Sequence, residues 1–152
     1  MVRPAEISNR VEDYLRVIYE VVKRKGYART KDIAAELGVK PPTVTEMLKK
    51  LDREGLISYE RYGAVTLTKK GEEIARSVES RHETFVKLLE MLLVPEEVAR
   101  RDAHVLEHGL SPKTIEQFTK FVEFISNSPS YPMFMKRWLE LFRSYCEGGK
   151  IR

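Results

Sequence analysis

Apolar residues recur every three or four positions along most of the chain, a spacing typical of amphipathic helices that bury one face. The first such pattern predicts a helix over residues 10–25. Asn9 is its expected cap, with Glu12 as the reciprocal partner of that cap, and Gly26 ends the helix. The apolar face of this helix consists of Val11, Tyr14, Leu15, Ile18 and Val22.

Two shorter helices follow, and each is ended by a glycine. Thr30 is the expected cap of a helix over residues 31–37. After a three-residue turn, Pro42 suits the first turn of a helix that runs to about Glu54. The apolar stripe of this second helix consists of Val44, Met47, Leu48 and Leu51.

A β-hairpin and a series of longer helices complete the pattern. Segments 56–60 and 64–68 are rich in β-prone residues and are separated by only three residues, which predicts the hairpin. The fold class is therefore mainly α with a small β-hairpin. The further helices are expected at residues 68–92, 95–109, 112–126 and 133–146.

The order of elements over residues 30–68 predicts a winged helix-turn-helix, with the hairpin as the wing. In such a module the start of the second helix enters the major groove of DNA. Threonines there can donate to phosphate or contact a thymine methyl, Glu46 can accept from cytosine, and lysines can neutralise phosphate. The alternative is a winged helix that contacts protein. The candidate DNA-binding residues are Lys40, Pro42, Thr43, Thr45, Glu46, Lys49 and, at the hairpin tip, Arg61.

Composition narrows the class of protein. The chain has 152 residues, of which 42% are hydrophobic and 33% charged, so it is neither disordered nor a membrane protein by composition. No apolar run approaches the roughly 20 residues that span a bilayer, and no secretory signal is evident, so we expect a cytoplasmic protein that has no membrane partner. The single cysteine excludes an internal disulfide. The net charge of +4 permits nucleic-acid binding.

Three side chains suited to a metal ion fall on one helix. His104, Glu107 and His108 have spacing i, i+3 and i+4, so they project from the same face. Two imidazoles and a carboxylate suit a borderline divalent cation. The alternatives are a helix end with a capping histidine, or the zinc site of a small HxxEH metallohydrolase, for which the chain offers no substrate-enclosing fold. Taken alone, His82 reads as a core histidine, and Asp13 as an acid favoured by the helix dipole.

The chain resembles the diphtheria-toxin-repressor family, and its manganese-transport-regulator branch most closely. The resemblance covers nearly the whole chain and includes a long, highly specific segment over the helix-turn-helix and wing. The matching motifs are EDYLRVIYEV (12–21), GYARTKDIAAELGVKPPTVTEMLKKLDREGLISYERYGAVTLTKKG (26–71), RHE (81–83) and LEHGLS (106–111).

The resemblance implies two domains and a set of ligands. Residues 1–73 are expected to form the winged-helix DNA-binding domain, residues 74–146 a helical metal-binding and dimerisation domain, and residues 147–152 a tail. Independently of the resemblance, the apolar stripes at 74–92 and 112–126 suggest the dimer surfaces, and the alternative is that both stripes are buried within one chain. The implied ligands are Asp13, His104, Glu107 and His108, with His82 contributing to a neighbouring position.

Departures from the family pattern bear on the metal. Arg16 stands where the manganese branch has a glutamate that helps to hold a second ion, and His104 stands where that branch has a glutamate. Val86 and Arg100 replace residues of the ancillary site of the iron branch. An arginine cannot coordinate a metal, and His104 makes the site softer than a site richer in carboxylates. Manganese is the first expectation, with iron or zinc as alternatives.

The expected function is a metal-dependent repressor of metal-ion uptake genes. It would bind a palindromic, double-stranded operator as a homodimer when Mn(II) or Fe(II) is bound, and it would be neither an enzyme nor a binder of small organic substrates. The alternatives are a winged-helix regulator that metal does not control and the small metallohydrolase.

Overall fold

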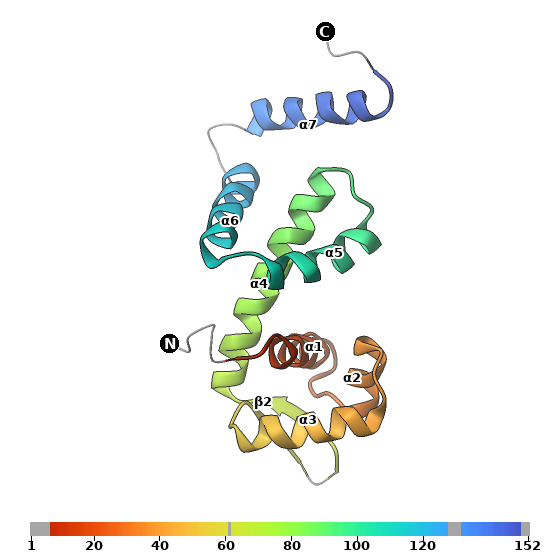
Figure 1. Ribbon diagram of the computed structural model, residues 1–152, viewed down its shortest axis with the longest axis vertical. Helices are drawn as coiled ribbons and strands as arrows, with labels where there is room; N and C mark the ends of the chain where they lie inside the picture. Colours follow the sequence, from red (N-terminus) through yellow and green to blue (C-terminus); the bar gives the residue numbers. More distant parts are fainter. Residues whose placement is uncertain (1–6, 61, 128–131, 150–152) are drawn as a thin grey trace. The chain divides into compact units, whose positions relative to one another are not determined.

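The chain folds into two compact units, Met1–Ser80 and Arg81–Arg152 (Figure 1). The computed structural model describes residues 7–60, 62–127 and 132–149. It is mainly helical with one two-stranded antiparallel hairpin, which confirms the predicted fold class. Within the described ranges, none of the helices combines the length and the apolar character that crossing a membrane requires. The domain boundaries drawn from the sequence stay predictions.

Helix α1 (Asn9–Lys25) opens the first unit and begins one residue earlier than its sequence pattern predicts. Asn9, the expected cap, is the first helical residue, and Ser8 is the cap. The Ser8 hydroxyl oxygen accepts a hydrogen bond from the Val11 N–H at 3.2 Å. Serine and asparagine cap helices about equally well, so the sequence alone does not separate two such neighbours. Gly26 ends the helix with a left-handed φ of 88°.

Helices α2 (Thr30–Leu37) and α3 (Pro41–Arg53) form the helix-turn-helix. Thr30, the expected cap of α2, is instead its first residue, and the N–H of Arg29 donates to the Asp32 carboxylate at 3.0 Å. Two prolines start α3, where their missing N–H groups are not needed. The buried stripe of α3 is the predicted one: Val44, Met47, Leu48 and Leu51.

The wing consists of strands β1 (Ile57–Tyr59) and β2 (Val65–Leu67). Its two strands are antiparallel, with Ile57 opposite Leu67 and Tyr59 opposite Val65. Ala28, between α1 and α2, exchanges two backbone hydrogen bonds with Val65 at 2.9 and 2.8 Å, which fixes the wing to the helices. The core of this unit gathers fully buried side chains from all three helices and the wing: Leu15, Ile18, Ile33, Val44, Leu48, Leu51, Ile57 and Val65.

Helix α4 (Lys69–Met91) begins directly after the wing and continues into the second unit. The Thr68 hydroxyl donates to the Gly55 carbonyl at 2.7 Å, and its oxygen accepts from the Gly71 N–H at 3.2 Å. Gly71 passes the backbone of Leu56 so closely that a Cβ there would lie 1.8 Å from the Leu56 carbonyl oxygen. Only glycine fits this position without a backbone shift.

The second unit holds the end of α4 together with α5 (Glu96–Gly109), α6 (Pro112–Asn127) and α7 (Pro132–Cys146). Its core is small. Phe85 of α4 is fully buried and meets Phe118 of α6 edge to face, with ring centroids 5.8 Å apart. Ala99 and Ala103 of α5 are fully buried in the same cluster.

An apolar groove of about 640 Å³ lies in the second unit, formed by the end of α4 with α6 and α7. Much of its lining is exposed to solvent, including Trp138 at 62% and Phe121 at 49%. Its lining is almost wholly apolar: Leu88, Met91, Leu92, Phe121, Ile125, Met135, Trp138, Leu139, Leu141, Phe142 and Tyr145. Cys146, the last residue of α7, is exposed.

Candidate metal centre and nucleic-acid interface

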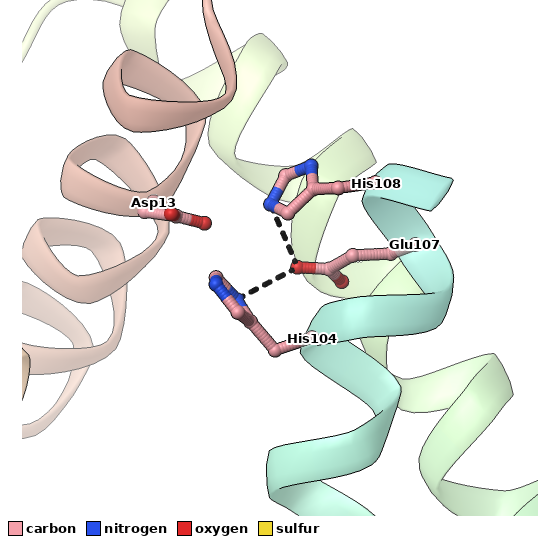
Figure 2. Close-up of side chains that lie close together, drawn as sticks. All are labelled: Asp13, His104, Glu107 and His108. Carbon is pink, nitrogen blue, oxygen red and sulfur yellow. Dashed lines mark ion pairs between the residues drawn. The ribbon is translucent and has the colours of Figure 1, made fainter. Parts of the chain in front are cut away.

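Three of the expected metal ligands lie together on α5, as their spacing predicts (Figure 2). One carboxylate oxygen of Glu107, Oε1, lies 3.5 Å from Nδ1 of His104 and 3.4 Å from Nε2 of His108. The two imidazole rings meet edge to face with centroids 4.9 Å apart. The cluster is buried at Glu107, whose side chain is 0% exposed, and opens toward solvent at His104, which is 42% exposed.

His82 approaches the same carboxylate from α4. Its Nδ1 lies 3.2 Å from the other oxygen of Glu107, Oε2, and the two side chains are 4% and 0% exposed. Among the described residues, neither oxygen of Glu107 nor Nδ1 of His82 has a hydrogen-bond partner. Nδ1 of His82 and Oε2 of Glu107 are nevertheless close enough to each other for a hydrogen bond. The local spacing on α5 carries no sign of His82, so the sequence pattern alone could not place it against Glu107.

The buried carboxylate of Glu107 tests whether this site suits a metal ion. Burying an ionised carboxylate costs several kcal/mol unless positive charge and hydrogen bonds compensate it. Here no hydrogen bond reaches either oxygen from the described residues, while two imidazole nitrogens lie around one of them. Imidazole and carboxylate ligands are those that borderline divalent cations accept. The donor set therefore fits a bound divalent metal.

Asp13 lies on α1 in the first unit and is half-buried. Arg16, one turn further along the same helix, is engaged by Glu20, with 3.1 Å between Nη1 and the carboxylate oxygen. A guanidinium is a cation and offers no metal-binding lone pair. Position 16 therefore supplies positive charge where the resemblance leads one to expect a ligand.

Arg100 lies between two acids of the second unit. Its guanidinium pairs with Glu83 of α4 at 3.2 Å and with Glu96 of α5 at 3.3 Å. Partial burial alone would lower the pKa of Arg100, but the hydrogen bonds to the two carboxylates outweigh it and raise that pKa above its ordinary value. Val86 is buried in the core. Neither residue can ligate a metal, in keeping with the departures seen in the sequence.

Five of the candidate DNA-binding residues lie at the start of α3, and Lys49 lies further along that helix. Four of them are exposed, and Thr43 and Thr45 are half-buried. The Thr45 hydroxyl donates to the Pro41 carbonyl at 3.2 Å, so its hydrogen is used within the helix. Arg61 lies outside the described residues. The exposed ones are Lys40, Pro42, Glu46 and Lys49.

The basic residues around the start of α2 are partly neutralised by acids. Lys25 bonds both oxygens of Asp32 at 3.1 Å, and Lys23 lies 3.5 Å from Glu79. Arg29 instead lies over the ring of Tyr27, 5.4 Å from its centroid. The count of basic residues in the sequence does not reveal these pairs, because the acidic partners come from later helices.

Two family models match the chain. The model described as iron dependent repressor, N-terminal DNA binding domain, matches residues 6–65. The model described as iron dependent repressor, metal binding and dimerisation domain, matches residues 68–132. The two matches together account for most of the sequence, and α7 begins where the second one ends.

The chain is also similar to proteins described as HTH-type transcriptional regulator MntR. It is 40% identical to the one from Lysinibacillus sphaericus (strain C3-41) over 119 residues, which are 78% of this chain and 86% of that relative. With the one from Bacillus subtilis (strain 168) the identity is 39% over 114 residues, 75% of this chain and 80% of the relative.

Solved structures share the fold. The manganese regulator SloR matches with a TM-score of 0.63 and 36% identity, covering 75% of this chain and 54% of its own. The structure of T. acidophilum IdeR matches with a TM-score of 0.60 and 28% identity, covering 79% of this chain and 55% of its own. This chain therefore spans about half the length of those two solved chains.

Proposed function

Because the chain belongs to the iron-dependent repressor family of metal-dependent, DNA-binding transcriptional regulators, we propose that it represses genes for metal-ion uptake. It binds a palindromic operator as a homodimer when Mn(II) or Fe(II) is bound, and acts in the cytoplasm. Family membership makes it a regulator and not an enzyme, which speaks against the metallohydrolase.

The proposed ligands in the second unit are His104, Glu107 and His108 (Figure 2). The family resemblance adds Asp13 of the first unit. The observation that carries this proposal is the Glu107 carboxylate, which is fully buried and accepts no hydrogen bond from the described residues. When bound, the ion supplies the positive charge that this carboxylate lacks.

Manganese is the first choice of metal. Solved relatives are titled a manganese regulator and a manganese-dependent repressor in complex with manganese, and another, ScaR, was solved with zinc bound. Two imidazoles make the site softer than one dominated by carboxylates, and affinity alone favours the later first-row metals. Iron and zinc are therefore the alternatives.

The start of α3 is the proposed reader of the operator. In this proposal Pro42, Thr43, Thr45 and Glu46 meet base edges, while Lys40 and Lys49 neutralise phosphate. Arg61 is assigned to the wing contact with DNA from its place at the tip of the predicted hairpin. With ligands drawn from both units, metal occupancy and DNA binding are coupled, and each strengthens the other by the same factor.

The apolar groove of the second unit is the proposed dimer surface. It includes parts of the stripes at 74–92 and 112–126 and adds α7. The second family model describes a dimerisation domain, and exposed apolar side chains such as Phe121 and Trp138 need a covering surface. In a two-fold dimer the same patch on each subunit supplies that cover.

The test measures DNA affinity with and without metal. A duplex is first selected from a randomised pool by the Mn(II)-treated protein, and its affinity is then measured with chelator and with each divalent metal at equal free concentration. We expect Mn(II) to strengthen binding by about 5- to 150-fold, the range of an ordinary allosteric coupling. Glu107→Gln, which removes the charge and keeps the shape, should abolish that gain and leave the dimer intact.

Glu123→Gln is the matched control, because Glu123 is an exposed carboxylate on α6 outside the site. It should respond to metal as the wild type does. Operator affinity that is the same with metal and with chelator would indicate a regulator that metal does not control. A metal response that survives in Glu107→Gln would contradict the ligand assignment, and failure to select any duplex would overturn the function.

A further inference from the structure

The two oxygens of the Glu107 carboxylate face different surroundings. Oε1 lies near His104 and His108, the two imidazoles closest to solvent, whose side chains are 42% and 13% exposed. Oε2 faces His82, and there both side chains are almost completely buried. The carboxylate therefore has one side open to an arriving ion and one side closed.

The closed side has too few ligands for an ion of its own. Within the second unit, Oε2 of Glu107 lies 3.2 Å from Nδ1 of His82. An ion between His82 and Oε2 would have two protein ligands. Such an ion normally takes four to six ligands, and the burial of both side chains leaves little access for water to supply the others.

His82 Nδ1 and Glu107 Oε2 are natural partners for each other. Both atoms are buried, both lack a hydrogen bond within the described residues, and 3.2 Å separates them. A buried donor or acceptor that is left unpaired destabilises the fold, and an N–H···carboxylate bond removes both penalties at once.

In place of the ligand role that the resemblance implies, we propose that His82 is a positioning residue of the metal site. Its Nδ1–H donates to Oε2 of Glu107 and so holds the carboxylate with Oε1 directed to the ion. The inference rests on the proposed metal-dependent function. It goes further in separating the histidines: His104 and His108 bind the ion, whereas His82 acts only through Glu107.

Two substitutions at position 82 separate the roles. His82→Asn keeps a side-chain N–H close to the place of Nδ1, and His82→Leu fills the space without a donor. For wild type and both variants, Mn(II) affinity and ions per subunit are measured by calorimetry, and the visible absorption of bound Co(II) reports the ligands. The metal-free proteins are compared by circular dichroism.

We expect the same number of ions and the same Co(II) bands in all three proteins. Loss of an outer partner of a ligand typically costs 10- to 100-fold in metal affinity, so His82→Leu should bind Mn(II) that much more weakly. His82→Asn should bind as tightly as the wild type. If the leucine variant is unfolded, the asparagine variant alone decides by its affinity and spectrum.

Three outcomes would overturn the proposal. Shifted Co(II) bands or fewer ions in His82→Asn would make His82 a ligand. Full Mn(II) affinity in a folded His82→Leu would remove its positioning role. A wild type that binds no metal would refute the proposed function together with this inference. Metal binding by the wild type is therefore measured before any variant is compared.

Discussion

The Thr45 hydroxyl shows how one hydrogen bond narrows what a side chain can offer to DNA. Its hydrogen is donated to the Pro41 carbonyl within α3. For DNA it retains a methyl group and the oxygen lone pairs. The sequence leaves two roles for Thr45, donation to a phosphate and contact with a thymine methyl. Because the hydroxyl hydrogen is already donated within the helix, the methyl contact is the favoured role.

Thr45→Val should therefore keep most of the operator preference, since valine retains the methyl contact. Thr45→Ser should lose about 0.8 kcal/mol per protein–base contact, roughly fourfold in affinity, because serine lacks the methyl. Affinities are measured for the selected duplex and for duplexes in which single thymines are replaced by deoxyuridine. The wild type and the valine variant should discriminate between these bases, and the serine variant should not. The opposite ranking of the two variants would contradict the methyl contact.

The metal site was predictable from the sequence only where its residues are near neighbours. His104, Glu107 and His108 follow helical spacing, so a single helix brings them together. The approach of His82 to Oε2 of Glu107 joins two different helices, α4 and α5, so helical spacing along one segment cannot reveal it. The role of Asp13 came from the family resemblance and stays a proposal.

At the scale of elements, glycines and prolines mark the helix ends well, because their backbone preferences are local. The predicted limits of the helices are accurate to within one or two residues. The caps of α1 and α2 are each wrong by one residue, since Ser8 and Asn9 are equally suitable and Arg29 is joined to Asp32 through its backbone. The close approach of Gly71 in α4 to the backbone of Leu56, the residue before β1, could not be predicted from the sequence.

Gly71→Ala should destabilise the first unit. The added Cβ would lie 1.8 Å from the Leu56 carbonyl oxygen, a backbone atom that cannot turn aside. We expect a loss of at least about 1–3 kcal/mol in the free energy of unfolding, the usual cost of overpacking. Urea denaturation followed by circular dichroism measures it.

Gly109→Ala serves as the control, because nothing lies within 4 Å of a Cβ at that helical position. It should be neutral or stabilising by about 0.5–1 kcal/mol, the ordinary gain for alanine over glycine in a helix. Equal losses in the two variants would show that the close contact with Leu56 is not what requires a glycine at 71.

At the scale of the whole molecule, the apolar groove predicts how copies of the chain associate. Leu141 lines the groove and is 41% exposed. Leu141→Glu should weaken the dimer strongly. Burial of a leucine contributes about 1.5–3 kcal/mol, and a two-fold interface loses that contribution twice. Sedimentation velocity over a range of protein concentrations measures the change.

Met133→Glu is the matched control for this experiment. Met133 is 84% exposed on the same helix and does not line the groove. The Met133→Glu dimer should dissociate at the same protein concentration as the wild-type dimer. A Leu141→Glu protein that remains dimeric at that concentration would place the interface on another surface.

Cys146 at the end of α7 gives each subunit a single chemical handle. It is exposed, and the chain has no other thiol, so a maleimide spin label would attach at one position only. A dimer then carries two labels, both at the end of the helix that contributes to the groove. The distance between them reports directly whether the two α7 helices come together, and the same labelled sample can be measured with metal and then with DNA added.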